Sequence, residues 1–303
     1  MPEHHGDPTA EYLALREGTG LVDPGWAAVA VRGPDAVSFL DGLLSQSLVP
    51  GRTVRTFLLG PRGKLRAIAW ACVDEEAVVL VTDADRRDVL GDDLAGYRIR
   101  VKAEITDDDR PVRLLVGPGA DEVLGHEVPA GGWVTFDDVL VGDVSMAGRP
   151  RRLVLGDADL SAATPAGSLA ATALRVELGE PVMDVDVDEG TIPQETGLVP
   201  VAVDFDKGCY LGQELVARID SRGRVNQRLV GIRLTTNVVP PTGSAVRLGD
   251  REVGTVTTVA ESLDLRAPVG LAVVRREAED GAAVEVVWEG GSAPAVVAPL
   301  PLI

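Results

Sequence analysis

From Asn226 onward the chain contains only short apolar runs, and no other feature restricts its fold as strongly. Each run is bounded by glycine, proline or charged residues, and no apolar spacing typical of a helix lies between the runs. Short strands without intervening helices bury their apolar faces by closing on one another. The pattern therefore predicts a small β-barrel or sandwich from Asn226 to the C-terminus. The runs are Leu229–Leu234, Ala245–Leu248, Arg251–Val259, Pro268–Val274 and Ala283–Trp288.

The residues before Asn226 mix strand and helix patterns. Three apolar runs separated by turn residues, within residues 54–82, predict consecutive antiparallel strands. A strand, a Gly-Pro turn and a helical pattern occur in this order twice, around Gly33 and around Gly117. This echo predicts two related α/β units. The expected helices are Glu11–Arg16, Val37–Leu44, Asp83–Leu94 and Thr172–Leu178; the expected strands are Trp26–Val31, Val54–Leu59, Leu65–Val73, Ala77–Thr82, Arg98–Ile105, Val112–Val116, Val134–Met146 and Arg152–Leu155, with Asp107–Asp109 as a turn.

Length and composition indicate a cytoplasmic protein of two or three domains. The chain has 303 residues, of which 45% are hydrophobic and 25% charged, so it can bury a sizeable core. Its only cysteines, Cys72 and Cys209, fit a reducing compartment better than a disulfide framework. The first nine residues lack the pattern of a signal peptide, and no apolar run is long enough to span a membrane.

The formal net charge of −18 argues against direct binding to nucleic acid. Such binding depends on neutralising phosphates with lysine and arginine. One local exception is a group of arginines after residue 217, which would either hold a small anion or form a solvated helix end. Both interpretations stay open at this point. The group comprises Arg218, Arg222, Arg224 and Arg228.

The most specific stretch of the chain is residues 204–218. Acidic residues and Gly208 predict a loop, and apolar positions from Leu211 onward predict a helix. Cys209 would then lie just before the helix start, where the helix dipole and the nearby Lys207 favour the thiolate. The alternative is a small buried cysteine without reactivity.

No motif for a metal or a dinucleotide withstands inspection. The carboxylates between Asp184 and Glu195 are spaced as in a calcium loop, but Glu189 occupies the position that requires glycine. Glu122 likewise replaces the third glycine of a dinucleotide fingerprint. The three histidines and two cysteines have no ligand spacing, so no metal site is predicted.

Residues 207–214, Lys-Gly-Cys-Tyr-Leu-Gly-Gln-Glu, match every position of a short signature and so resemble the YgfZ family. These proteins are folate-binding relatives of the glycine cleavage T-protein. The resemblance extends over nearly the whole chain, because further similar segments follow in the same order. They are Arg16–Asp23, Arg32–Ala36, Arg175–Gly179, Ile192–Leu198, Val253–Thr257 and Val269–Ala272.

This resemblance implies an α+β fold in which three domains form a T-protein-like ring around a channel the size of tetrahydrofolate. Two α/β units and a C-terminal β-barrel would build the ring. The expected domains are residues 1–50 together with 147–225, which would bind the folate, then residues 51–146, and finally residues 226–303 as the barrel.

The resemblance also implies a function in the assembly or repair of iron–sulfur clusters. The cofactor would be tetrahydrofolate or a derivative, and the partners would be iron–sulfur client or assembly proteins, including enzymes that modify tRNA. Cys209 would be the functional thiol, Lys207 would tune it, and Glu177 would hydrogen-bond the pterin ring. The other expected cofactor-binding residues are Arg175, Tyr210 and Gln213.

One departure from the T-protein pattern leaves open whether the chain is an enzyme. The T-protein carries its catalytic aspartate in a Gly-Gly-x-x-Asp-Asp segment, whereas residues 62–67 here contain no acidic residue and place Arg66 there. Arginine cannot orient or stabilise a reacting folate nitrogen as a carboxylate does. A folate-dependent aminomethyl or methyl transferase and a non-catalytic binding or scaffold protein remain as alternatives.

Overall fold

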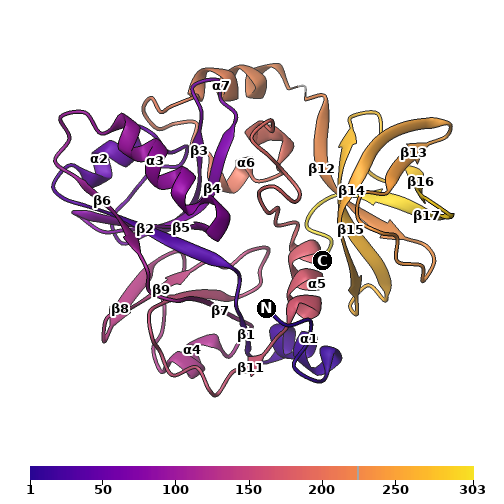
Figure 1. Cartoon of the computed structure of the whole chain (residues 1–303), viewed down its shortest axis with the longest axis horizontal. Helices are drawn as coiled ribbons and strands as arrows, with labels where there is room; N and C mark the ends of the chain where they lie inside the picture. Colours follow the sequence, from indigo (N-terminus) through magenta and orange to yellow (C-terminus); the bar gives the residue numbers. More distant parts are fainter. Residues whose placement is uncertain (224) are drawn as a thin grey trace.

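The computed structural model describes residues 1–223 and 225–303 and contains two β-sheets with helices and a closed β-barrel (Figure 1). Helix α5 (Ser168–Leu178) lies between the sheets and the barrel. The predicted α+β fold with a C-terminal barrel is therefore confirmed. No helix of the described residues is long and apolar enough to cross a membrane.

The first sheet is antiparallel throughout, in the order β3-β4-β5-β2-β6. Helices α2 (Ala36–Asp41) and α3 (Arg87–Tyr97), the latter preceded by the short helix η1 (Ala84–Arg86), pack with it around one core. The apolar runs that predicted the three central strands contribute to this core, because one side of each strand faces the helices. The strands are β2 (Trp26–Arg32), β3 (Thr53–Leu59), β4 (Leu65–Val73), β5 (Ala77–Asp83) and β6 (Glu104–Asp108).

The second sheet has the order β11-β1-β7-β10-β9-β8, with only β1 and β11 parallel. It shares a core with the other face of the first sheet and with helices α1 (Pro8–Glu17) and α5. Helix α4 (Ala120–Leu124) follows β7. The strands are β1 (Gly20–Val22), β7 (Val112–Val116), β8 (Trp133–Phe136), β9 (Val139–Asp143), β10 (Arg151–Leu155) and β11 (Thr164–Pro165).

The barrel closes in the order β12-β15-β14-β13-β16-β17, so it leaves no open sheet edge. Apolar side chains from all six strands fill it, and Val176 of α5 packs on its outside. The sequence pattern predicted five of these strands and missed β17, whose run contains Pro294. The strands are β12 (Gln227–Leu234), β13 (Ala245–Leu248), β14 (Arg251–Ser262), β15 (Ala267–Arg275), β16 (Ala283–Trp288) and β17 (Gly291–Ala298).

Helix α5 receives both ends of the chain. The carbonyls of Pro2 and Glu3 accept the amides of Ser168 and Leu169, which are among the first N–H groups of the helix and have no partner within it. At the other end, Gly179 ends the helix in the left-handed conformation with φ of 70°. The amide of Leu302 donates to the carbonyl oxygen of Glu177 at 2.7 Å.

The predicted echo of strand, Gly-Pro turn and helix is present in both sheets, as β2–α2 and as β7–α4. Gly33 and Gly117 have φ of 132° and 116°, a region that favours glycine. A Cβ at either residue would overlap a carbonyl oxygen, of Lys102 and of Gly18 respectively. The two turns therefore need glycine for the same geometric reason.

Two strands differ most from the sequence predictions. Strand β6 begins at Glu104 rather than Arg98 and includes Asp107 and Asp108, because this edge strand pairs only with β2. The single strand expected over 134–146 is a hairpin, β8 and β9, that turns at Asp137 and Asp138, both with positive φ.

The strand pairing also groups residues differently from the expected domains. β2, within the expected first domain, pairs with β5 and β6, whereas β7 and β9 belong to the sheet of β1 and β10. The sheets thus join residues 26–108 in one unit and residues 20–22 with 112–165 in the other.

Candidate functional site

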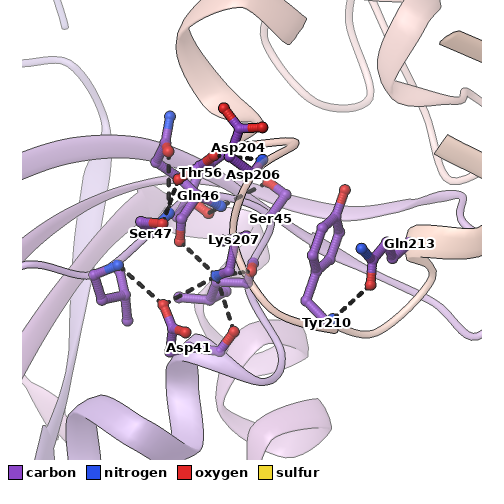
Figure 2. A network of polar contacts seen from close by, with 12 residues as sticks. Asp41, Ser45, Gln46, Ser47, Thr56, Asp204, Asp206, Lys207, Tyr210 and Gln213 are labelled. Carbon is purple, nitrogen blue, oxygen red and sulfur yellow. Dashed lines mark hydrogen bonds and ion pairs between the residues drawn. The ribbon is translucent and has the colours of Figure 1, made fainter. Parts of the chain in front are cut away.

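Residues 203–212, the signature loop, lie between helices α6 (Val199–Ala202) and α7 (Gln213–Arg222). Lys207 fixes this loop to the end of α2 (Figure 2). Its ammonium donates to the main-chain oxygens of Asp41, Leu44 and Gln46 at 2.9 Å each, and to Oδ1 of Asp41 at 3.0 Å. The side chain is only 2% exposed. Burial lowers the pKa of Lys207, although the contact with Asp41 opposes this shift.

Further contacts hold the same loop at its beginning and end. Ser47 donates to the carboxylate of Asp204, and the amide of Asp204 donates to the carbonyl of Ser45 at 3.0 Å. The Ser47 hydroxyl and the amide of Asp206 lower the pKa of Asp204. Leu211 binds the carbonyl of Gly42 through its amide at 3.1 Å. The loop is therefore held on the segment that joins α2 to β3.

Cys209 is a free, exposed thiol on this loop. The sequence predicted a helix from Leu211, just after Cys209, whereas α7 begins two residues later at Gln213, with Gly212 as its N-cap. The ammonium of Lys207 is directed at its four oxygen acceptors, and Cys209 is not among its hydrogen-bond partners in the described chain. The predicted tuning of the thiol by Lys207 and by the helix dipole therefore lacks geometric support.

Gly212 allows a close crossing of two backbones. Its φ is 79°, and a Cβ there would lie 2.8 Å from the oxygen of Gly60 and 2.9 Å from Cα of Gly63. The glycine accommodates the turn between β3 and β4 rather than a ligand.

Tyr210 and Gln213, both expected to bind cofactor, also build the loop. The side chain of Gln213 accepts the amide of Tyr210 at 3.2 Å, which closes the turn before α7 (Figure 2). The Tyr210 ring is buried in a core with Phe57 and Val216, and its centroid lies 5.6 Å from the Lys207 nitrogen. Burial and Asp204 raise the pKa of Tyr210 to about 12.

A cavity of about 200 Å³ lies between the two sheets and α5, away from this loop. Aromatic walls come from Trp26 on β2 and Trp70 on β4. Neither Cys209 nor any other residue of the signature is among its lining residues. The charged lining residues are Arg55, Asp83, Arg151, Arg175 and Glu180.

A buried ion cluster occupies one side of the cavity. Glu180, which follows α5, accepts from Arg55 of β3 at 2.5 Å and from Arg151 of β10 at 2.7 Å. All three side chains are at most 8% exposed. Burial alone would raise the pKa of Glu180, but the two guanidinium groups outweigh burial and lower it to about 2. The cluster joins both sheets to the end of α5.

Arg175 is the one expected cofactor-binding residue that lines the cavity. Its guanidinium donates to the Glu180 carbonyl at 2.8 Å, to Asp186 at 2.5 Å and to Thr258 of the barrel at 2.8 Å. It therefore places a cation at the cavity while connecting α5 to β14.

Glu177 does not line the cavity, so the structure does not support its predicted contact with a pterin ring. Its carboxylate is completely buried and accepts from Tyr12 of α1 and Ser262 of β14, both at 2.5 Å. Helical spacing explains the difference, because Glu177 faces α1 and the barrel while Arg175 faces the cavity. We assign Glu177 to the contact between these elements.

The other charged residues singled out in the sequence are in ion pairs. Arg66 binds Asp93 of α3 at 2.6 Å and Glu189 at 2.6 Å, outside the cavity. Arg218 and Arg228 pair with Glu214 and Asp280, so they do not form a shared anion site. The remaining members of that group fall outside this description, since Arg224 and the side chain of Arg222 are not among the described residues.

Sequence reasoning missed most of the cavity, including Arg55, Arg151, Asp83 and Glu180. A signal was present, because Arg55 lies within an apolar run that predicts a buried strand. A buried charge of this kind requires a partner. The partner, Glu180, is 125 residues away in sequence, and no local pattern joins the two.

The chain is similar to two groups of known proteins. Residues 227–303 match the family of the glycine cleavage T-protein C-terminal barrel domain. The tRNA-modifying protein YgfZ of Edwardsiella ictaluri is 31% identical over 79% of both chains. The chain belongs to the YgfZ family. An aminomethyltransferase of Rubrobacter xylanophilus is 29% identical over 99% of this chain and 87% of that protein.

The comparison of structures agrees with the fold of this YgfZ-family protein. The glycine cleavage system aminomethyltransferase T of Bartonella henselae matches it with a TM-score of 0.87, over 97% of this chain and 89% of the other. At 21% sequence identity, this likeness establishes a shared fold. The YgfZ-family chain is thus built like a T-protein.

Proposed function

We propose that this YgfZ-family protein binds tetrahydrofolate or a derivative in the cavity and acts in the assembly or repair of iron–sulfur clusters. Cys209 is the functional thiol in this proposal. The observation that carries it is an exposed, free cysteine on a loop held by a buried lysine. A structural cysteine would be buried, as Cys72 is.

The cavity suits the ring of a folate better than the whole molecule. Pockets that enclose drug-sized ligands are typically about 300–1,000 Å³, and this one is about 200 Å³. Its indole walls would stack on a flat heterocycle, and the charged groups would bind the polar edge of that heterocycle. The glutamate tail of the folate would extend outside.

The position of Cys209 separates its chemistry from the cavity. Because the thiol lies on the surface and does not line the cavity, its substrate would arrive on another molecule. An iron–sulfur client or assembly protein is the partner class that the family resemblance favours. Enzymes that modify tRNA would then be affected through their clusters, in the cytoplasm.

The test replaces Cys209 with serine in cells that lack their own YgfZ and measures the activity of a cluster-dependent enzyme. We expect loss of most of the rescue, because serine cannot supply a thiolate at neutral pH. Cys72→Ala is the matched control, since Cys72 is buried and burial raises its pKa to about 12. Full rescue by Cys209→Ser would remove the thiol from the mechanism.

Folate-dependent aminomethyl or methyl transfer is the second candidate, favoured by the identity to an aminomethyltransferase over nearly the whole chain. Arg66 opposes the T-protein version, since its guanidinium is committed to Asp93 and Glu189. Turnover of a methylated tetrahydrofolate by the purified protein would support transfer. Calorimetry that detects no tetrahydrofolate binding would instead favour a scaffold without catalysis.

A further inference from the structure

We propose that Asp83 is the residue that recognises the ligand in the cavity, by accepting hydrogen bonds from an amino-substituted lactam edge of a flat heterocycle. This inference rests on the proposed function and names the chemistry of the same site. Asp83 is the last residue of β5, and nothing in the signature points to it.

The first argument is that Asp83 has acceptor capacity left. The cavity lining contains two carboxylates, and the other one, Glu180, is saturated by Arg55 and Arg151. The carboxylate of Asp83 forms no ion pair within the described chain. The one hydrogen bond that this carboxylate accepts there comes from the amide of Met183 at 3.2 Å. Oδ2 accepts that amide through one of its lone pairs, so Oδ1 and the second lone pair of Oδ2 are available to a ligand.

The second argument is the position of Asp83 beside an aromatic wall. In the register of β2 and β5, Trp26 lies directly opposite Asp83. Residues that face each other in this way project from the same side of a sheet. A heterocycle stacked on the Trp26 indole would therefore bring its edge to the Asp83 carboxylate.

The third argument is electrostatic. Burial raises the pKa of Asp83, and the nearby Glu180 carboxylate raises this pKa further. The Met183 amide and the cations of Arg55 and Arg175 lower the pKa, but burial outweighs them. A carboxylate with this environment lacks donors for its charge. Two N–H groups on one side of a ring, as in the amino-lactam edge of a pterin, would supply them in the plane of the carboxylate.

The position of Asp83 also bears on the absence of acidic residues around Arg66, where the T-protein has its catalytic aspartate. The T-protein segment carries its acidic residues where this chain has residues 62–67, and those residues do not line the cavity. Asp83 comes from the neighbouring strand and does line it. Asp83 thus supplies an acidic group at the cavity from the strand next to that segment, for recognition of the ring and not for the reaction of the T-protein aspartate.

The test measures binding of tetrahydrofolate and of its 2-desamino analogue to the purified full-length protein by anaerobic calorimetry. We expect the wild type to prefer tetrahydrofolate by about tenfold to a hundredfold, the range for one buried hydrogen bond to a charged group. Asp83→Asn should lose this preference, because its carbonyl can still accept the Met183 amide while the charge is gone. Asp93→Asn, outside the cavity, is the control and should keep the preference.

The outcomes separate the two proposals. If the wild type binds tetrahydrofolate and Asp83→Asn discriminates as well as the wild type does, the role of Asp83 is wrong and folate binding stands. If the wild type binds neither compound, both proposals are wrong.

Discussion

At the residue scale, two cations near the signature show that burial decides what a charge does. Lys207 is 2% exposed and binds four oxygens, whereas Arg218 is 53% exposed and pairs with Glu214 on its own helix. A buried charge with several partners is costly to remove, while an exposed pair contributes little. The lysine of the signature therefore has a structural explanation that does not involve the thiol.

Replacing Lys207 with methionine should lower the free energy of unfolding by about 2–3 kcal/mol, because three partly buried carbonyl oxygens lose the cation that binds them. Urea denaturation measures this change. Arg218→Met, at an exposed position, should stay within about 0.5 kcal/mol of the wild type. If Lys207→Met is as stable as the wild type but its Cys209 reacts several-fold more slowly with a maleimide, the lysine tunes the thiol after all.

The sequence indicated the site only in part, and chain separation explains the rest. Local pattern located the loop and Cys209, because a loop and the following helix leave their mark within a few residues. The cavity depends on Asp83, Arg55 and Glu180, which come together only when both sheets and α5 have packed. The family resemblance implied a ligand role for Glu177, but it carries no information on the direction of this side chain on α5.

At the element scale, the two sheets share one construction, in which a strand leads through a Gly-Pro turn into a helix. Each turn glycine touches the backbone of a distant segment, residues 102–103 in one case and residues 14–18 in the other. The turns therefore fix how each sheet meets its neighbours. A side chain at either glycine would force those neighbours apart.

Gly117→Ala should lower the free energy of unfolding by about 2–4 kcal/mol, since positive φ and the overlap with Gly18 both oppose a Cβ. Gly91→Ala is the matched control. Gly91 lies inside α3, where a Cβ meets no atom within 4 Å, so alanine should stabilise the protein by about 0.5–1 kcal/mol. Thermal unfolding of both variants gives the comparison, and equal effects would contradict it.

Strands that form apolar runs between turn residues were predictable from the sequence, whereas strands whose bounds depend on pairing with a neighbour were not. β3, β4 and β5 are apolar runs bounded by turn residues, and the structure has them as consecutive antiparallel strands. The strand expected over 98–105 lies instead at Glu104–Asp108, because Asp107 and Asp108 resemble a turn in the sequence, yet an edge strand needs no apolar partner on its outer side. The β8–β9 hairpin turns at two aspartates with positive φ. The sequence does not show this turn, so residues 134–146 were predicted as one continuous strand.

At the scale of the whole molecule, the cavity and the Cys209 thiol lie apart. The cavity lies where both sheets meet α5, and Cys209 lies exposed on a loop beyond α2 and β3. The whole chain carries a formal net charge of −18. A surface thiol on so acidic a protein suits a protein partner better than a polyanion.

We therefore expect the purified protein to bind bulk tRNA more weakly than about 100 µM at roughly 150 mM salt, because it cannot neutralise phosphates over an extended surface. A gel mobility shift with a basic RNA-binding protein as positive control measures this. Submicromolar retention of tRNA would show that local cations overcome the net charge, and the partner class would need revision.

The way Lys207 is held bears on how such a chain can drift over evolutionary time. Three of its four acceptors are main-chain oxygens, of Asp41, Leu44 and Gln46, which any amino acid at those positions would offer. At Leu44 and Gln46, whose side chains do not bind the lysine, the receiving segment can therefore change its side chain without losing a bond to Lys207, whereas the lysine side chain supplies all four bonds. In related genes, this asymmetry would leave a short sequence motif around the lysine and a variable sequence in the segment that binds it.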